Sequence, residues 1–561
     1  MRSGIIREAT TSEPVSLPFG AAYAPFIEDA ERRLEAKAGP LASRLLARSA
    51  REDLVSVLEG WIAAVSGKVL AHEFALYRLD RRSSIEMLVA EQAGGSNRLY
   101  RGFIDHLLAG DWDAVDRAYP ELKRLRNRVV ATWIATTVEL LERLDRDRDL
   151  LGHAFAGESP AERVTSVRPL SDDRHDGGRI VLRLTFDDGA RIVYKPRTVG
   201  IEAWFGDFLS EVTSGTRFSD LRTPDLVDRG GYGWAEFIDS HACESEAAVS
   251  RFFERGGALL AVLHALGSVD CHLENIIASG EHPVLVDAET VIQAEPGPWL
   301  DEPGPNVPPD DFGVMQTGFL PNPVRTGAPD TSGLDGGRRS VAVEGVLVWK
   351  NVGSDRMALR EGAIPSPTAA NGVHLGHERI DPRDFVASIT HGFEVMYRQL
   401  LERRASVLDS WLWASARERR VRFLARSTST YWLLALSSLE PRFLADESRR
   451  REELERVYAP LSGCERPRRL RPLLEAEFEA LDNLDVPAFS VAADATDLEL
   501  PDCTVTNFFS ESSLARAERR LRSLDEADCA RQVAHIRMSL DRSEDVLSVS
   551  GGRVPASAQR S

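Results

Sequence analysis

The sequence is poor in the features that mark secreted, membrane-spanning and nucleic-acid-binding proteins. Its five cysteines are scattered and form no C-x-x-C pair, which argues against a disulfide framework and favours a reducing compartment. The N-terminus has no apolar core of signal-peptide length, and no apolar run approaches the length of a membrane span. We therefore expect a cytoplasmic protein without a membrane span.

Basic residues are also fewer than acidic ones. The 69 lysines and arginines are outnumbered by 87 aspartates and glutamates, which gives a net charge of −18 and argues against DNA or RNA as a partner. Lysine itself is nearly absent, with five among the 69 basic residues. A lysine kept in an apolar strand pattern, such as Lys195, is therefore expected to serve for its compact ammonium, which arginine does not reproduce.

The chain is long enough for several structural units. Its 561 residues are too many for one hydrophobic core, so two or three domains or lobes are expected. Apolar residues recur at helical spacing through residues 20–155, which predicts a helical region. A charged run at residues 145–149 closes this region and is expected to be a solvated helix end leading into a linker.

From about residue 160 the apolar pattern becomes that of strands. Residues 180–186 and 191–195 flank a D-D-G turn, which predicts a β-hairpin with Lys195 near its end. A helix follows at 201–212, and one of its carboxylates, Glu202, Asp207 or Glu211, is expected to orient the lysine. A strand at 233–238 and a helix at 247–266 come next. Strand, loop, strand with lysine and helix follow one another in this order in the N-lobe of a kinase.

The residues with the strongest chemical pattern lie at 269–289, V-D-C-H-L-E-N-I-I-A-S-G-E-H-P-V-L-V-D-A-E. Asp270, His272 and Asn275 lie within six residues, and Asp287 follows Asn275 by twelve, at the end of an apolar strand pattern. A D-x-H-x-x-N loop and a strand aspartate are how phosphotransferases hold a base, a supporting histidine and two metal ligands around one nucleotide. Phosphoryl transfer needs these groups at fixed reach from one metal–phosphate cluster, so the pattern predicts a phosphotransfer site.

The sequence after Glu289 is looser. Residues 293–338 are rich in proline and glycine and contain D-F-G at 311–313. This tripeptide follows a Pro-Pro pair rather than an apolar strand, and Asp287 already stands where a kinase places its metal-binding aspartate, so Asp311 is not expected to bind metal. The segment is expected to be an activation segment or a substrate-facing lid. Helices are predicted at 385–412 and 427–439, and a disordered tail beyond Met538.

Seven separate motifs resemble one family. They are D-R-H at 173–175, V-Y-K-P-R at 193–197, G-W-A-E-F at 233–237, H-L-E-N-I-I-A-S-G-E-H-P-V-L-V-D-A-E-T at 272–290, Q-T-G-F-L-P at 316–321, V-R-F-L-A-R-S-T-S-T-Y at 421–431 and L-D-V-P-A-F at 484–489. Together, and in this order, they resemble the dehydratase domain of LanM-type (class II) lanthipeptide synthetases. The resemblance covers roughly residues 30–545.

The resemblance implies an α+β fold, with a lipid-kinase-like bilobal core, a large helical N-terminal region and helical C-terminal additions. The expected divisions are a helical region at 1–158 and a kinase-like core at 159–415, with its N-lobe at about 159–240 and its C-lobe at about 241–415. A helical part at 416–545 would carry the elimination residues, and 546–561 would be a disordered tail.

The resemblance also implies a two-step reaction on a ribosomally made precursor peptide. ATP, with Mg²⁺, first phosphorylates Ser or Thr. The same site then removes the α-proton and expels phosphate, which leaves dehydroalanine or dehydrobutyrine. Activation comes first because hydroxide is a poor leaving group and phosphate a good one.

The family roles can be carried over by position. On this resemblance Asp270 is the base or orienter for the substrate hydroxyl, and His272 supports the loop. Asn275 and Asp287 bind Mg²⁺, with Glu289 nearby.

Other family positions serve the nucleotide and the elimination step. Lys195 would hold the ATP phosphates. The family's R-x-x-x-x-x-T pair falls on Arg422 and Thr428, and its D-x-H in the nucleotide-covering loop falls on Asp173 and His175.

Two features depart from the family pattern. LanM enzymes continue into a zinc cyclase domain, whereas residues beyond 500 include Cys503, Cys529 and His535 without metal-type spacing. Cyclisation is therefore absent, performed by a separate protein, or lost with a truncated chain. Cys271 stands in the catalytic loop where a bulkier apolar residue is expected, and a packing substitution is favoured over a redox switch.

Two other functions stay open. The D-x-H-x-x-N loop alone fits a kinase for a peptide or small molecule that performs no elimination. An inactive module that presents a precursor peptide to other enzymes is the second alternative. The intact set of Lys195, Asp270, Asn275 and Asp287 argues against it, because a dead scaffold would usually have lost one of these residues.

Overall fold

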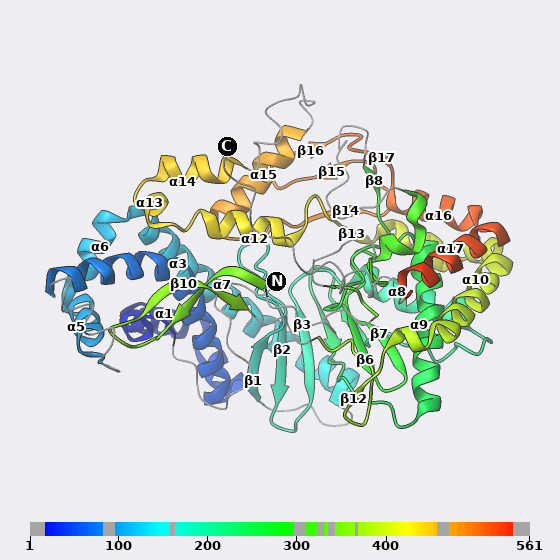
Figure 1. Cartoon of the computed structure of the whole chain (residues 1–561), viewed down its shortest axis with the longest axis horizontal. Helices are drawn as coiled ribbons and strands as arrows, with labels where there is room; N and C mark the ends of the chain where they lie inside the picture. Colours follow the sequence, from blue (N-terminus) through cyan, green and yellow to red (C-terminus); the bar gives the residue numbers. More distant parts are fainter. Residues whose placement is uncertain are drawn as a thin grey trace, which may run out of the picture.

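The computed structural model describes residues 17–81, 96–156, 163–296, 310–322, 330–334, 343–364, 369–456 and 470–541. Its helices lie to both sides of a small antiparallel sheet, with the N-terminal helices on the left of Figure 1. The expected mixture of helix and sheet is confirmed. The expected tail at 546–561, the division at 158/159 and more than half of the loop at 293–338 lie outside the described residues.

The N-terminal region is helical, as its apolar spacing predicts. Its helices are α1 (Ala24–Ala38), α2 (Pro40–Leu45), α3 (Arg48–Arg81), α5 (Arg98–His106), α6 (Trp112–Ala118) and α7 (Pro120–Leu151). The long helices α3 and α7 pack together, and the indole N–H of Trp133 on α7 donates to the carbonyl of Leu54 on α3 at 2.9 Å. Among the described helices, α3 has the length and composition of a membrane span, and 50% of its apolar window is buried inside the molecule. Core helices of soluble proteins meet the same criterion.

The charged run at 145–149 is not simply a solvated helix end, so that expectation is wrong for Asp147. This residue is 1% exposed on α7. Its carboxylate accepts hydrogen bonds from the Tyr232 hydroxyl at 2.7 Å and the Trp234 indole at 2.9 Å, and it pairs with Arg229 at 3.0 Å. Burial of a carboxylate is tolerated because these donors, about 85 residues away in the chain, satisfy it.

A five-stranded antiparallel sheet follows, in the order β1-β2-β3-β5-β4. Its strands are β1 (Val164–Pro169), β2 (Leu182–Phe186), β3 (Arg191–Lys195), β4 (Leu226–Asp228) and β5 (Gly233–Glu236). The predicted hairpin is present as β2 and β3, with Leu182 opposite Tyr194. Sheet residues such as Leu184 and Trp234 share one hydrophobic core with Leu58 and Trp133 of the N-terminal helices, so these helices brace one face of the sheet.

Helices α8 (Gly200–Thr213), α9 (Glu246–Leu266) and α10 (Val386–Leu408) build a second core on the other side of the molecule. The backbones of α9 and α10 approach closely: a Cβ added to Gly257 would lie 1.9 Å from the Ile389 carbonyl oxygen, and one added to Gly392 would lie 1.9 Å from that of Glu254. Glycine at both positions therefore permits the helix crossing.

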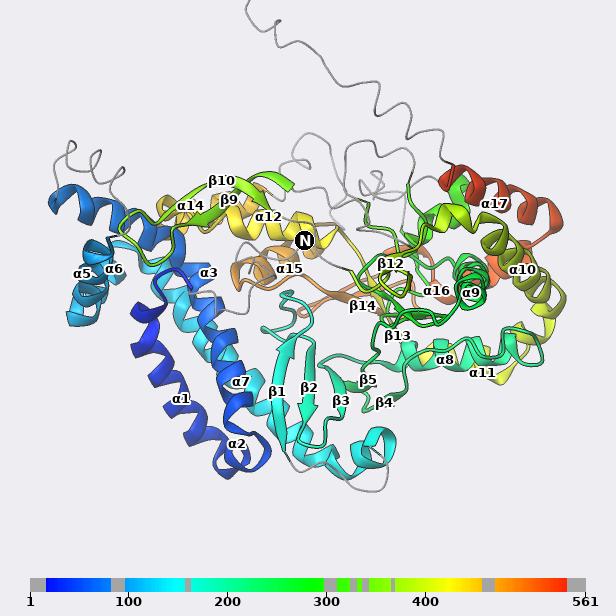
Figure 2. The same cartoon turned by 60° about the horizontal axis from the view of Figure 1, so that its bottom comes forward.

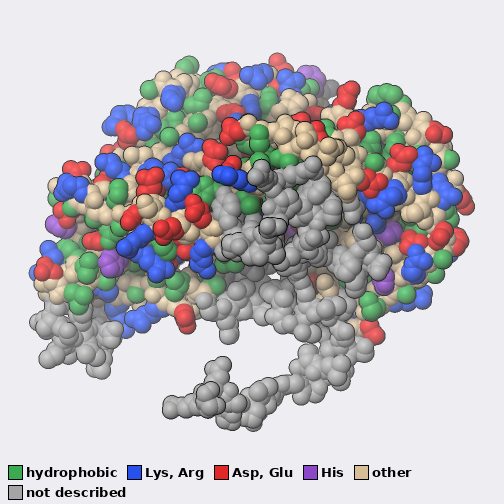
Figure 3. Space-filling model, turned by 90° about the horizontal axis from the view of Figure 1, so that it is seen from above, with side chains coloured by type: hydrophobic (Ala, Val, Ile, Leu, Met, Phe, Trp, Pro, Cys, Tyr) green, Lys and Arg blue, Asp and Glu red, His purple; other side chains and the backbone are tan. Residues whose placement is uncertain are grey.

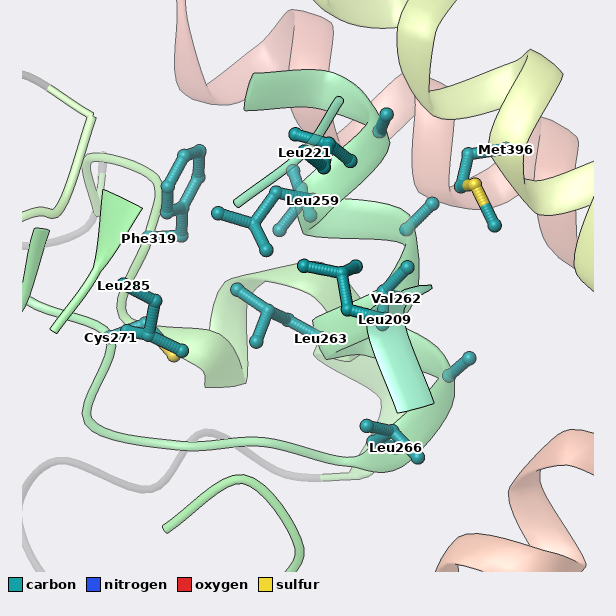
Figure 4. Packing of buried hydrophobic residues seen from close by; sticks show 14 of the residues in the cluster. Leu209, Leu221, Leu259, Val262, Leu263, Leu266, Cys271, Leu285, Phe319 and Met396 are labelled. Carbon is teal, nitrogen blue, oxygen red and sulfur yellow. The ribbon is translucent and has the colours of Figure 1, made fainter. Parts of the chain in front are cut away.

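The second core reaches the D-x-H-x-x-N loop. Figure 4 shows Leu259 and Leu263 of α9 directed toward Phe319, Leu285 and Cys271. Cys271 is 3% exposed, and burial raises the pKa of its thiol. These observations support the packing interpretation of this cysteine, because a redox-active thiol needs access and thiolate character.

The loop motif runs into the short strands β6 (Ile276–Ser279) and β7 (His282–Leu285). The expectation that Asp287 ends the strand needs a small correction, because β7 ends at Leu285. The Val286 N–H still donates to the Asn275 carbonyl at 2.9 Å, after which the chain turns away. This bond keeps Asp287 beside Asn275.

The chain then crosses between the two sides of the molecule. The hairpin of β9 (Val343–Lys350) and β10 (Ala358–Ile364) lies over the N-terminal helices (Figures 1 and 2), where Trp349 packs on Gly67 of α3 and on Phe19. The D-F-G aspartate lies in the 3-10 segment Asp310–Thr317, in which the Val314 N–H donates to the Gln532 side chain. Smaller pairs are formed by β8 (Glu295–Pro296), β11 (His374–Leu375), β12 (Glu378–Arg379) and β17 (Phe509–Glu511).

The C-terminal part contains a third hydrophobic core. Strand β13 (Arg420–Phe423) pairs with β14 (Phe489–Ala492), so Arg422 faces Ser490 in the register. The other elements are α11 (Trp411–Ser415), α12 (Thr428–Ser437), α13 (Pro441–Leu444), α14 (Glu447–Leu454), α15 (Arg471–Asp482), β15 (Leu498–Glu499), β16 (Thr504–Val505), α16 (Ser513–Ser523) and α17 (Glu526–Ser539). Of these elements, α12, α15, β13 and β14 lie above the sheet in Figure 1, where the third core forms, whereas α16 and α17 lie beside α10 and join the second core. On the face seen in Figure 3, basic and acidic side chains of the described residues are interspersed.

Candidate active site

Lys195 and Glu202 form a buried ion pair at the end of the sheet. Lys195 is the last residue of β3, and Glu202 lies in the first turn of α8. The Lys195 ammonium donates to the Glu202 carboxylate and to the Val286 carbonyl, the latter at 2.8 Å. Of the three carboxylates left open by the sequence, the structure brings Glu202 to the lysine, whereas Asp207 is exposed on the same helix.

Arg197 contacts three carboxylates. It is the last residue of the V-Y-K-P-R motif and was not among the predicted site residues. Its Nη1 donates to Glu202, its Nη2 donates to both oxygens of Asp287 at 2.9 Å, and its Nε pairs with Glu289 at 3.0 Å. Burial acts to lower the pKa of Arg197, but these three carboxylates raise it well above its usual value. The guanidinium is therefore charged and fully engaged.

Asp270 occupies a strained position in a firmly held loop. Its φ of 63° lies in the left-handed region, which costs a non-glycine residue on the order of 1–3 kcal/mol. The flanking backbone is fixed on both sides: the Thr290 hydroxyl donates to the Val269 carbonyl at 2.7 Å, and the Cys271 N–H donates to the Thr317 carbonyl at 2.7 Å. Through the Thr317 carbonyl, the Q-T-G-F-L-P motif thus supports the backbone of the Asp270 loop.

The charge of Asp270 is set by burial, by His272 and by Arg422. Burial raises the pKa of this carboxyl, and His272 and Arg422 act in the opposite direction without cancelling the rise. Although the surrounding protein is dense, 34% of the Asp270 side-chain surface is accessible. Asp270 is therefore a carboxylate of increased basicity that a substrate hydroxyl is able to reach.

His272 and Asn275 complete the loop. The Glu274 N–H donates to Nδ1 of His272 at 3.2 Å, so the neutral imidazole carries its proton on Nε2, which lies 3.5 Å from Asp270. The Asn275 amide donates to the Asp270 carbonyl at 2.8 Å. Its side-chain oxygen has no hydrogen-bond partner among the described residues.

Asp287 carries a strongly stabilised negative charge. Burial acts to raise the pKa of its carboxyl, but Arg197, Lys195 and Arg422 lower it well below its usual range. Its Oδ1 also accepts the Glu289 N–H at 3.3 Å. An ionised carboxylate is the kind of oxygen ligand that Mg²⁺ prefers.

Arg422 reaches this cluster from the C-terminal part. Its guanidinium pairs with the Glu289 carboxylate, and its backbone N–H donates to the Glu289 carbonyl at 3.0 Å. The Gln293 side-chain amide donates a hydrogen bond to the Arg422 carbonyl at 2.9 Å. Glu289 consequently touches both Arg197 and Arg422, and it connects the residues assigned to phosphorylation with the arginine assigned to elimination.

The D-x-H residues lie beside Arg422. Nδ1 of His175 lies 2.8 Å from the Val486 carbonyl, which accepts only, so Nδ1 carries the proton and Nε2 is the basic nitrogen of the neutral ring. Burial and the charge of Arg422 lower the pKa of His175. Asp173 accepts the indole N–H of Trp432 on α12 at 2.5 Å, which holds this loop against the helix.

Thr428 is the least constrained of the candidates. It is the first residue of α12, and no hydrogen bond joins it to the other site residues within the described ranges. Three residues later, Tyr431 donates to Glu477 at 2.5 Å, and the charge of Arg422 acts on its pKa. Since positions three apart share a helix face, Thr428 lies on the same side of α12 as Tyr431.

Comparison with known proteins places this arrangement in a family. A family model described as "Domain of unknown function (DUF4135)" matches residues 119–492, more than half of the chain. The chain belongs to this family. All the candidate residues, from Asp173 to Thr428, lie within the part that matches the DUF4135 model.

A curated relative agrees with the resemblance drawn from the motifs. The lacticin 481/lactococcin biosynthesis protein LcnDR2 of Lactococcus lactis subsp. lactis is 23% identical over 464 residues, which are 78% of this chain and 48% of the relative. The chain therefore spans about half the length of this relative. The expected similarity of this DUF4135 protein to LanM-type lanthipeptide biosynthesis proteins is confirmed.

Proposed function

We propose that this chain is an ATP-dependent dehydratase that phosphorylates Ser or Thr of a precursor peptide and eliminates the phosphate to give dehydroalanine or dehydrobutyrine. The observation that carries the proposal is the Glu289 carboxylate, which touches Arg197 on one side and Arg422 on the other. Arg422 is brought there across 133 residues, and it adds a guanidinium that is suited to bind a departing phosphate. The relative's name, a lacticin biosynthesis protein, supports a role in lanthipeptide maturation.

The fold supports a kinase-like first step. A five-stranded antiparallel sheet presents Lys195, α8 supplies Glu202, and α9 leads into the Asp270 loop. We propose that this is a lipid-kinase-like bilobal core, with its N-lobe at about 159–240 and its C-lobe at about 241–415. Lys195, held in place by Glu202, would contact the nucleotide phosphates.

Mg²⁺ fits the donor set. The side-chain oxygen of Asn275 has no partner among the described residues. The backbone bond from Val286 to Asn275 holds the segment of Asp287 against this loop, and the Glu289 N–H donates to Asp287. Asn275, Asp287 and Glu289 would hold the ion, since Mg²⁺ prefers oxygen ligands. When bound, Mg²⁺ supplies positive charge that neutralises the transferring phosphoryl group.

In the first step Asp270 accepts the proton of the substrate hydroxyl, whose oxygen then bonds to the γ-phosphorus while the bond to ADP breaks. The raised pKa of Asp270 favours this role because it makes the carboxylate a better base. His272 holds its Nε2–H toward the same carboxylate. Both residues therefore act on the attacking group.

In the second step a base removes the α-proton, the C–H electrons form the C=C bond, and the C–O bond breaks with its electrons on phosphate. Arg422 stabilises the leaving phosphate. The neutral ring of His175, with its basic nitrogen at Nε2, is suited to accept the proton. Thr428 lies at the N-terminus of α12, where the helix dipole favours an anion.

The proposal is tested by intact-mass analysis of a cognate precursor peptide incubated with the chain, ATP and Mg²⁺. Loss of water from the peptide, preceded by a transient gain of phosphate, is expected. Asp287→Asn should abolish both changes, while the control Asp207→Asn, an exposed residue of α8, should retain them. Stable phosphopeptide from the wild-type chain would instead indicate a kinase, and failure to bind Mg²⁺–ATP in calorimetry would indicate an inactive precursor-binding module.

A further inference from the structure

Arg197 holds the two carboxylates that the proposed function assigns to Mg²⁺. Both oxygens of Asp287 lie 2.9 Å from its Nη2, and an oxygen of Glu289 lies 3.0 Å from its Nε. A third carboxylate, that of Glu202, accepts from Nη1. The planar fork of arginine serves three separate acceptors at once, which the single ammonium of lysine does not reproduce.

This geometry conflicts with a cation at the same carboxylates. Mg²⁺ binds oxygen ligands at about 2.0–2.1 Å, so an ion on Asp287 would stand within a few ångströms of the guanidinium. Two cations at that separation repel strongly in a partly buried site. Arg197 must therefore withdraw from at least one oxygen of Asp287 when a metal ion binds there.

A phosphate offers the guanidinium a new partner. Arginine binds phosphate oxygens in two-point fashion, as it binds carboxylates. Lys195, which shares Glu202 with Arg197, is the residue expected to hold the nucleotide phosphates. A nucleotide phosphate beside Lys195 would consequently come within reach of Arg197.

Resting on the proposed function, we propose that Arg197 takes the place of the divalent cation on Asp287 and Glu289 in the nucleotide-free chain, and moves to a nucleotide phosphate when metal and nucleotide bind together. Arg197 is thus a positioning residue that couples the two ligands. Metal alone binds weakly because it displaces a guanidinium that has no other anion to join. Metal with nucleotide binds well because the phosphate receives that guanidinium.

The charges of the cluster support this assignment. Lys195, Arg197 and Arg422 face the carboxylates of Glu202, Asp287 and Glu289, and Asp270 adds a fourth negative charge. Removal of Arg197 would leave Asp287 and Glu289 with one fewer neutralising partner. A divalent cation is then the obvious replacement, even without nucleotide.

The experiment measures Mn²⁺ binding to the full chain by the electron paramagnetic resonance signal of the free ion, with and without ATP. Each sample is compared with a protein-free solution of the same composition, because ATP itself binds Mn²⁺. For wild type, ATP should tighten Mn²⁺ binding by at least about tenfold. In Arg197→Gln, Mn²⁺ alone should bind about tenfold more tightly than in wild type, and the effect of ATP should shrink to a few-fold. Arg191→Gln is the matched control, because Arg191 lies on the same strand and pairs with Asp239 at the surface.

The outcomes separate this inference from the proposed function. If wild type binds Mn²⁺–ATP but a folded Arg197→Gln protein shows unchanged or weaker Mn²⁺ binding without ATP, Arg197 merely ties α8 to the loop and the inference fails alone. If neither protein binds Mn²⁺ with ATP, the proposed metal–nucleotide site fails as well. Should Arg197→Gln not fold, thermal melting of wild type decides: Mn²⁺ alone should barely raise the melting temperature and Mn²⁺–ATP should raise it clearly, whereas equal shifts would overturn the inference.

Discussion

Replacing Arg422 with alanine should separate the two halves of the reaction. The guanidinium pairs with Glu289, and its charge also acts on Asp270 and Asp287. For the elimination step it is the cation assigned to the leaving phosphate, and removal of one preorganised donor costs about 10²–10³ in rate, or about 3–4 kcal/mol. Glu289 keeps Arg197 as a partner, so phosphorylation should fall by less than about tenfold, below 1.4 kcal/mol.

The assay is a quenched time course of intact peptide masses, fitted to successive phosphorylation and elimination rates. Arg422→Ala should accumulate phosphopeptide, which wild type shows only transiently. Arg420→Ala is the control, because Arg420 shares strand β13 and its face but pairs with Glu499 and Ser490. Full dehydration at the wild-type rate by Arg422→Ala, or an equal fall in both rates, would refute the role given to Arg422.

Three further predictions concern the nucleotide, the base and the fold. Glu202→Gln removes the carboxylate shared by Lys195 and Arg197. Because a hydrogen bond to a charged group contributes about 1.5–3 kcal/mol, the KM for ATP should rise by about 10–100-fold in steady-state assays. An unchanged KM would contradict the role given to the Lys195–Glu202 ion pair. The phosphorylation rate should fall as the pH drops through the raised pKa of Asp270. His272→Gln removes a partner that acts to lower this pKa, so the acid limb of the pH profile should move to higher pH. A move to lower pH would be inconsistent with the geometry. Gly257→Ala places a Cβ 1.9 Å from the Ile389 carbonyl oxygen, so the free energy of unfolding in urea should fall by about 1–3 kcal/mol. Its control is Gly60→Ala on α3, where an added Cβ meets no atom within 4 Å, and there the free energy of unfolding should rise by about 0.5–1 kcal/mol. Equal effects would argue against the close α9–α10 crossing.

Local patterns predicted the parts of the fold that depend on neighbouring residues. The β2–β3 hairpin follows from a D-D-G turn between alternating strands, and it placed Lys195 correctly at the end of β3. The limits of α8 and α9 agree with their apolar spacing to within a residue. The D-x-H-x-x-N spacing likewise brought Asp270, His272 and Asn275 into one loop.

Features that depend on residues distant in the chain could not be predicted from the local sequence. The choice of Glu202 over Asp207 and Glu211 depends on where the first turn of α8 meets the end of β3. The role of Arg197 depends on carboxylates about 90 residues later. The local sequence predicts a solvated Asp147, whereas its burial depends on the hydrogen bonds from Tyr232 and Trp234. Tertiary contacts decide such cases, and the local sequence carries no signal for them.

The contacts that unite the site are of the same kind. Arg422 comes to Glu289 because β13 pairs with β14, some 70 residues further along the chain, and because Gln293 holds its carbonyl. Neither pairing is visible in the spacing of residues 421–431. The family resemblance supplied Arg422 as a candidate, and the structure supplied the contact with Glu289 that gives it a position in the mechanism.

The central claim is that one site both installs and removes the phosphate. The most direct test supplies a precursor peptide already carrying phosphoserine at a modified position, together with Mg²⁺ and ADP, so that only the second step is required. The wild-type chain should convert phosphoserine to dehydroalanine, and Arg422→Ala should not. A phosphopeptide left unchanged by the wild-type chain, or hydrolysed back to serine, would contradict the claim.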